Sequence, residues 1–324
     1  MRAACRAGVA SAMRRAASTA PAPPVLVASV YISEGRNAAL IAALARAAGA
    51  PCLRVFADAP YNRTGFTLAS ASPPLLEAAA LRLASAALAS LDLRAHDSSH
   101  PRLGVVDHVA VHALGSASDA QRRSLASASA TRIGASFASQ LSLPVWLYGW
   151  ASDRGAQLDA VRRALGYFAP HQPHGQPPPV VAPLRPDMGP EVVDPAAGVA
   201  CVGAVPWVVN YNILLRSAAG GDADDAALMA AARRVAGVAS ARRGGLPSVQ
   251  ALALRHAAGV EVACNLLDPL VTTPATVLAA VTVRAQKEGL SVVAAYETGM
   301  DAEQLLQMAR AAGGRGDEHA AAAG

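Results

Sequence analysis

Residues 169–199 are so dense in proline and glycine that no helix or strand can continue through them for long. On either side of this segment, short apolar runs alternate with Ala-rich runs that suit helices. A chain of 324 residues is long enough to bury one large core or two smaller ones. The segment therefore predicts two units, and we place the division between them at residues 180 and 181.

The same order of elements is predicted on both sides. In the first half we expect strands at 25–32, 51–58, 64–70, 104–114 and 144–150, with helices at 33–49, 73–91 and up to 139. In the second half we expect strands within 198–215, a hairpin from 248 to 268, a strand at 291–297, and helices at 224–237, 274–288 and 301–311. Strand–helix–strand–strand–helix–strand is the split βαβ order. The expected fold class is α+β, with two ferredoxin-like (βαββαβ) subdomains at residues 25–180 and 181–312.

The two ends of the chain differ in composition from its body. The first 24 residues contain four arginines and no acidic residue, and the first carboxylate in the chain is that of Glu34. A basic, Ser/Ala-rich leader is typical of a transit peptide. We expect residues 1–24 to direct the protein to the mitochondrial matrix, with the plastid as the alternative. The Gly/Ala-rich end, residues 313–324, is expected to be disordered.

Charge and hydropathy exclude two classes of partner. The net charge is +5, but without the four leader arginines the chain has 24 basic and 23 acidic residues. No basic surface for nucleic acid is therefore expected. No apolar run reaches about 18 residues without a charge or a helix breaker, so we expect no membrane span.

Four histidines at 96, 100, 108 and 112 suggest, by their spacing in fours, a metal site on a helix. Pro101 prevents a helix from continuing through His100, and the residues after it alternate as in a strand. On that strand His108 and His112 share one face, and Asp107 lies on the other. We therefore favour histidines that are hydrogen-bonded or exposed, and expect no metal.

His100 differs from the other three because it ends a polar loop directly before a strand and is followed by Pro101 and Arg102. A histidine at such a place can accept and return a proton near neutral pH. The alternative is a loop histidine bonded only to the backbone. Asp107, on a mainly apolar face, needs a partner, which His100 or an arginine could supply.

Seven motifs occur in an order that resembles the formiminotransferase domain. They are YISEGRN (31–37), Asp58 followed by YNRTGFTL (61–68), HPRLGVVD (100–107), PVWLYG (144–149), PDMGP (186–190), WVVNYNILL (207–215) and EVACNLLDP (261–269). The resemblance covers about residues 25–312 and is closest to plant-type, single-domain members. We therefore expect a formiminotransferase domain alone, without the cyclodeaminase domain of the animal bifunctional enzyme.

This resemblance implies a fold, a reaction and a set of site residues. The fold has a substrate tunnel between the sheets of two subdomains. The reaction moves a formimino group, or in related members a formyl group, from a glutamate derivative to N5 of tetrahydrofolate. Tetrahydrofolate is then a co-substrate, no metal takes part, and the protein is expected to form a homodimer.

By the same resemblance, His100 is the general acid and base and Asp107 orients the imidazolium or balances its charge. Arg102 would bind a glutamate carboxylate. The other expected folate- or substrate-binding residues are Asp58, Asn62, Tyr148, Gly149, Met188, Gly189, Pro190 and Asn212. A non-catalytic folate-binding or structural subunit is the alternative, which Trp150 favours because the animal members have glutamate there.

Overall fold

The computed structural model describes residues 24–98, 100–115, 117–167, 184–218, 225–256, 258–269 and 271–321. The expected leader, apart from its last residue, and residues 168–183 lie outside this part of the chain. No helix in the described ranges is both long enough and apolar enough to cross a membrane.

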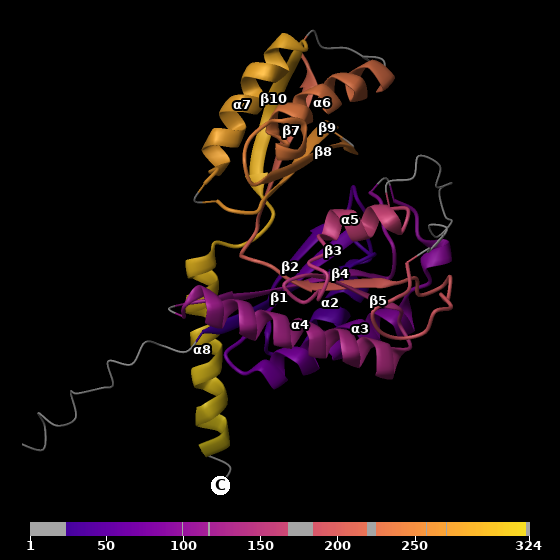
Figure 1. The fold of residues 1–324 in the computed structure, drawn as a ribbon, viewed down its shortest axis with the longest axis vertical. Helices are drawn as coiled ribbons and strands as arrows, with labels where there is room; N and C mark the ends of the chain where they lie inside the picture. Colours follow the sequence, from indigo (N-terminus) through magenta and orange to yellow (C-terminus); the bar gives the residue numbers. More distant parts are fainter. Residues whose placement is uncertain are drawn as a thin grey trace, which may run out of the picture.

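The described chain forms ten strands together with helices that separate most of them (Figure 1). In the first half they are β1 (Val25–Ile32), α2 (Ala38–Ala48), β2 (Cys52–Asp58), β3 (Arg63–Ser70), α3 (Pro73–Ser90), η1 (Leu93–Ala95), β4 (Val106–Leu114), α4 (Asp119–Leu141), β5 (Val145–Gly149) and α5 (Leu158–Ala164). The second half contains β6 (Ala200–Ala204), β7 (Val209–Ser217), α6 (Asp225–Ala239), η2 (Ala241–Arg243), β8 (Val249–His256), β9 (Gly259–Leu266), α7 (Pro274–Lys287), β10 (Leu290–Glu297) and α8 (Ala302–Ala321).

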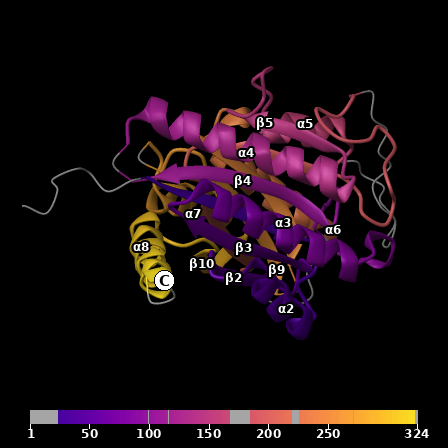
Figure 2. The same ribbon diagram turned by 90° about the horizontal axis from the view of Figure 1, so that it is seen from below.

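The first sheet has six strands in the order β2-β3-β1-β4-β6-β5. Strands β2, β3, β1 and β4 are antiparallel, whereas β6 runs parallel to both β4 and β5. Alternate residues of β1, such as Leu26 and Val30, join Phe66 and the apolar side chains of α2, α3 and α4 in one core. These three helices cover one face of the sheet (Figures 1 and 2).

The opposite face of the first sheet is covered in parts. The other β1 residues, Val25 and Val27, pack with Leu305 and Ala309 of α8, which returns from the far end of the second half. Helix α5 covers the β5 end, where Val161 packs beside Trp146 and Tyr148. Between α8 and α5 this face of the sheet is turned toward the second unit.

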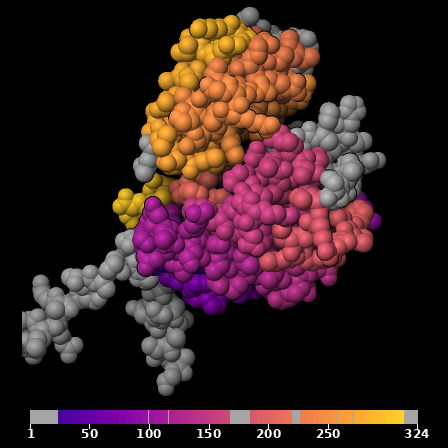
Figure 3. All heavy atoms as spheres, in the orientation of Figure 1, coloured from indigo at the N-terminus to yellow at the C-terminus, as the bar shows by residue number. Residues whose placement is uncertain are grey.

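The second sheet has four antiparallel strands in the order β10-β7-β9-β8. Helices α6 and α7 pack on one of its faces, around a core that includes Ile213, Val235, Val262 and Val281. Its other face is turned toward the first sheet, and the second unit lies stacked on the first (Figures 1 and 3).

The prediction of a mixed α+β protein with two sheets is confirmed. The division between the units differs from the predicted 180/181, because β6 belongs to the first sheet and only β7 begins the second. The apolar run ACVGA of β6 is fully buried between β4 and β5, where a parallel strand needs apolar residues on both faces.

Two helix boundaries differ from prediction, and one helix is additional. Helix α2 begins after Asn37, whose side chain accepts a hydrogen bond from the Leu40 amide, because the expected cap Ser33 bonds instead to the Gly104 carbonyl. Helix α5 was not predicted. The α8 backbone stays helical to Ala321, although residues 313–324 are predicted to be disordered; residues 313–321 contain three glycines but no proline that would end the helix.

Candidate functional site

A cavity of about 830 Å³ lies between the two sheets. The first unit lines it with residues from β1, β2, β3, β4, the loop before β4, and α5, and the second unit with residues from β7, η2, β8 and β9. Its volume lies within the usual range for small-molecule sites, and sites often form between two domains. Among the described residues, the rings of Tyr31, Phe56, Tyr61 and Tyr167 line it.

The cavity lining is rich in positive charge. Of the described residues that line it, five are arginines (Arg63, Arg162, Arg163, Arg242 and Arg243) and two are aspartates (Asp58 and Asp159). Asp159 pairs with Arg163 at 3.3 Å. Burial raises the pKa of Asp58, and the nearby Glu261 carboxylate raises it further. The excess of guanidinium groups suits an anionic ligand.

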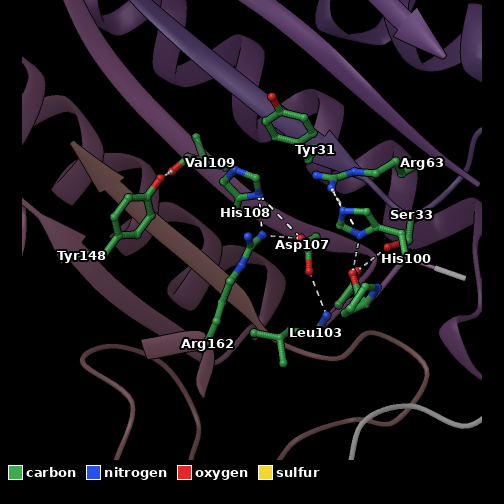
Figure 4. Close-up of polar contacts among 12 residues, drawn as sticks. Tyr31, Ser33, Arg63, His100, Leu103, Asp107, His108, Val109, Tyr148 and Arg162 are labelled. Carbon is green, nitrogen blue, oxygen red and sulfur yellow. Dashed lines mark hydrogen bonds and ion pairs between the residues drawn. The ribbon is translucent and has the colours of Figure 1, made fainter. Parts of the chain in front are cut away.

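His100 lies at the wall of this cavity with both ring nitrogens engaged (Figure 4). Nδ1 is 2.7 Å from the Pro101 carbonyl, which accepts only, so Nδ1 carries the proton. Nε2 then has the lone pair, and it accepts a hydrogen bond from Arg63 Nη1 at 2.8 Å. Burial and the Arg63 charge hold the pKa of His100 well below its usual value, so the ring is neutral at neutral pH.

Arg162 of α5 reaches the same wall and binds two neighbouring residues. Its Nη2 lies 2.6 Å from Asp107 Oδ2 and 2.8 Å from His108 Nδ1, and its guanidinium lies 4.3 Å from the centre of the Tyr167 ring. Burial opposes ionisation of Asp107, but Arg162 outweighs it and holds the pKa of this carboxyl far below its usual range. Burial, together with Arg162, lowers the pKa of His108 to about 3.

A β-bulge explains why Asp107 and His108 both reach Arg162. The consecutive residues Tyr31 and Ile32 pair with His108 and Val106, which leaves Asp107 as the extra residue of β4. The prediction that Asp107 and His108 point to opposite faces assumed a regular strand and fails at this bulge. The ring of His108 also stacks on that of Tyr31, with centroids 4.3 Å apart.

A second polar cluster joins the two units. Glu261 of β9 is fully buried, and its carboxylate accepts hydrogen bonds from Tyr61 (2.8 Å), Asn212 (3.0 Å) and Tyr296 (2.6 Å). Tyr61 belongs to the first unit and the other three residues to the second. The Tyr61 ring meets that of His100 edge to face at 5.5 Å, so the Glu261 cluster borders the histidine site.

No group of three or more His, Cys, Asp or Glu side chains in the described part of the chain is arranged to hold a metal ion. His96 and His112 are buried and bonded to backbone carbonyls, those of Asn62 (2.8 Å) and Pro206 (2.9 Å) respectively. The four histidines therefore bind different partners: His96 and His112 bind backbone carbonyls, and His100 and His108 bind different arginines at the cavity wall.

Comparison with known proteins gives a match over the whole first unit. Residues 25–205, from β1 to the residue after β6, match the family model described as the formiminotransferase domain, N-terminal subdomain. The chain belongs to the formiminotransferase family. The matched range ends just after β6, where the first sheet is complete.

Individual relatives extend the match beyond the first unit. The formiminotransferase cyclodeaminase-like protein of Arabidopsis thaliana is 40% identical over 291 residues, which are 86% of this chain and 94% of that protein. The formimidoyltransferase-cyclodeaminase of Sus scrofa is 31% identical over 276 residues, 83% of this chain but only 48% of the pig protein. The glutamate formimidoyltransferase of Streptococcus pyogenes is 29% identical over 188 residues, 56% of this chain and 60% of that protein.

The formiminotransferase motifs bring three of the expected residues to the cavity, namely Asp58, His100 and Asn212. Asp107 lies just behind the cavity wall. In the described part of the chain its oxygens bind Arg162 and the Leu103 amide, and no hydrogen bond joins it to His100. The orientation of His100 comes from the Pro101 carbonyl instead.

Asn62 and Arg102 lie beside the cavity, around a much smaller pocket. The Asn62 side chain links the Gly35 amide to the Asp97 carbonyl, and its backbone has φ of 45°. Arg102 is 6% exposed and donates to the His96 carbonyl. Both residues shape the loop that carries His100, and Arg102 is not placed at the cavity wall where a carboxylate would bind.

The remaining expected residues lie away from the cavity. The Tyr148 hydroxyl donates to the Val109 carbonyl in the sheet interior (Figure 4), and Gly149 ends β5. The loop of residues 186–190 runs along the outer edge of β5, where Met188 pairs with Val145. Trp150 packs on the core under α4, so its difference from the animal pattern does not touch the cavity.

Sequence reasoning missed Arg63 and Arg162. Arg63 lies within the motif YNRTGFTL, directly after the expected site residue Asn62. Arg162 lies on α5, for which Leu158, Val161 and Leu165 at spacings of three and four give a helix signal.

Proposed function

We propose that this protein transfers a formimino or formyl group between a glutamate derivative and N5 of tetrahydrofolate, in the cavity between the sheets. The observation that supports this best is a neutral His100 at the cavity wall whose one ring lone pair is on Nε2, where Arg63 now donates a hydrogen bond. Membership of the formiminotransferase family supports the class of reaction.

The proposal assigns proton transfer to His100. Its Nε2 takes the proton from N5 as N5 bonds to the formimino carbon, and returns it to the glutamate nitrogen as the old C–N bond breaks. The Pro101 carbonyl keeps the proton of Nδ1 in place throughout. Asp107, paired with Arg162, offsets positive charge near the ring while His100 is protonated.

The cavity residues suit a folate in shape and charge. Phe56 gives the cavity an apolar aromatic side chain against which a pterin can pack, and Arg63 suits the glutamate end of the folate. We further propose that the two units are ferredoxin-like, since both contain the βαββαβ order, and that the cavity is part of a substrate tunnel.

Calorimetric titration of the protein with tetrahydrofolate tests binding, and conversion with N-formimino-glutamate as donor tests transfer. Saturable binding with turnover supports the enzyme. Binding without turnover of formimino or formyl donors supports the non-catalytic folate-binding alternative, and absence of binding contradicts both.

A homodimer and a location in the mitochondrial matrix, with the plastid as the alternative, complete the proposal. The dimer rests on the family resemblance and the location on residues 1–24. Sedimentation of the purified protein tests the first of these.

A further inference from the structure

Arg63 differs from the two other arginines near His100 in what it binds. Arg162 is paired with Asp107 at 2.6 Å, and Arg102 donates to a backbone carbonyl. The guanidinium of Arg63 lies 4.5 Å from the centre of the Tyr31 ring and donates to His100. Among the described residues it forms no ion pair with a carboxylate, although it lines the cavity.

The contact between Arg63 and His100 prevents His100 from acting as a base while it is present. A hydrogen bond from a cation to Nε2 occupies the one lone pair that could accept a proton. A carboxylate is a stronger acceptor for a guanidinium than a neutral imidazole is, because the bond is charge-assisted on both sides and can be bidentate. A ligand carboxylate in the cavity would therefore compete with His100 for Arg63.

We infer that Arg63 is the anchor for a ligand carboxylate, and that binding of this carboxylate draws the guanidinium away from His100 and frees Nε2. The inference rests on the proposed function in taking His100 as the base. It assigns to Arg63 the role that the sequence suggested for Arg102, and it adds a coupling: the base is released when an anionic ligand arrives.

The charged and titratable groups around His100 fix the direction of the effect. Arg63 on β3 and Arg162 on α5 lower its pKa, and Asp107 on β4 raises it. The rings of Tyr61, before β3, and Tyr167, after α5, meet it edge to face. Arg162 is already neutralised by Asp107, so loss of the Arg63 contact is the change that raises the pKa of His100.

The test is an NMR titration of the His100 ring in the full-length protein, with glutarate as the dianionic probe and glutaramide as its neutral counterpart. We expect glutarate to raise the midpoint of the His100 titration by about one pH unit or more, and glutaramide to leave it unchanged. An unchanged midpoint in saturating glutarate, or no glutarate binding at all, would overturn the inference.

Two variants distinguish an effect of the hydrogen bond between Arg63 and His100 from an effect of the positive charge in the cavity as a whole. In Arg63→Gln the midpoint should be raised without any probe and should no longer respond to glutarate. Arg242→Gln removes one positive charge from the same cavity on η2, and should keep both the low midpoint and the response. Equal midpoints in the two variants would overturn the inference. Arg63→Lys, which keeps the charge, serves if Arg63→Gln does not fold, and its response to glutarate should be weakened.

These measurements need neither tetrahydrofolate nor turnover. A protein that shows the glutarate response but transfers no one-carbon group contradicts the proposed function and leaves the Arg63 contact supported. Turnover without the response contradicts the contact alone.

Discussion

The Tyr61 hydroxyl donates a hydrogen bond to Glu261 Oε2 over 2.8 Å, from the loop before β3 in the first unit to β9 in the second. The acceptor is a fully buried carboxylate whose other partners in the described chain, Asn212 and Tyr296, belong to its own unit. The contact therefore links the docking of the second unit to the loop beside His100.

Tyr61→Phe should lower the free energy of unfolding by about 1.5–3 kcal/mol, the usual range for a hydrogen bond to a charged group. It should also weaken tetrahydrofolate binding, because the cavity is formed by both units. Tyr296→Phe is the matched control, since it removes a bond to the same carboxylate within one unit. Urea unfolding and calorimetry measure the two effects. Equal losses of affinity in both variants would contradict a special role for the contact between units.

His100→Gln should reduce turnover by about 10²–10⁴-fold, the usual contribution of a positioned acid or base, with little change in folate affinity. His112→Asn is the control, because an asparagine amide can still donate to the Pro206 carbonyl. His108 is unsuitable as a control, since the structure places it at the cavity wall in contact with Arg162. Steady-state rates decide, and full activity of His100→Gln would remove this residue from the mechanism.

Arg162→Met should destabilise the protein by about 3–5 kcal/mol, because it leaves Asp107 as a buried carboxylate without its cation. In the double variant Arg162→Met, Asp107→Asn the charge is gone, while the asparagine oxygen can still accept from the Leu103 amide. The double variant should therefore be more stable than Arg162→Met alone. Urea unfolding of both proteins measures this. The prediction is wrong if the double variant is less stable than Arg162→Met by the full loss that Asp107→Asn causes alone.

Stability should fall as the pH is lowered from about 6.5 toward 4, in part through His112. Burial lowers the pKa of this histidine to about 4 in the folded protein, so the unfolded chain binds a proton in this window and the folded chain does not. The contribution of His112 to the free energy of unfolding is complete above pH 6.5, is lost by pH 4, and amounts to about 3 kcal/mol. His112→Asn should reduce the pH dependence of unfolding by up to one proton; an unchanged slope would contradict the assignment.

Residues 1–24 should be dispensable for folding. A protein beginning at Val25 should keep the melting temperature of the full chain, because β1 starts there and pairs with β3 and β4. Thermal unfolding checks this, and a large fall would contradict the transit-peptide interpretation. Import of a fluorescent fusion into isolated mitochondria and plastids distinguishes the two locations.

Periodicity was enough to predict most of the fold. The apolar runs of β1, β8, β9 and β10 and the helices α3, α4, α6 and α7 follow local rules of burial and capping, and these elements formed close to where expected. The assignment of β6 to the first sheet could not be predicted, because nothing local to ACVGA tells which unit it will join.

The site was predictable only in part. His100 stood out through its neighbours Pro101 and Arg102, and Asp58 and Asn212 through the family motifs. The contacts around His100 were not predictable. Arg63 reaches it from a position 37 residues away in the sequence. The bulge at Asp107 breaks the alternation from which the faces of a strand are predicted. Such contacts depend on how the elements pack, and the sequence pattern of one element does not contain them.

Helix α8 packs on the face of the first sheet that carries Val25 and Val27, yet it follows every other described helix in the sequence and is synthesised after them. On the ribosome, β1 through β6 can emerge and pair long before residues 302–312 leave the exit tunnel. During that interval an apolar strip of the sheet faces water or a chaperone. The second unit lies between β6 and α8 in the sequence, so it is synthesised before α8. It therefore has time to fold before α8 packs on the first sheet.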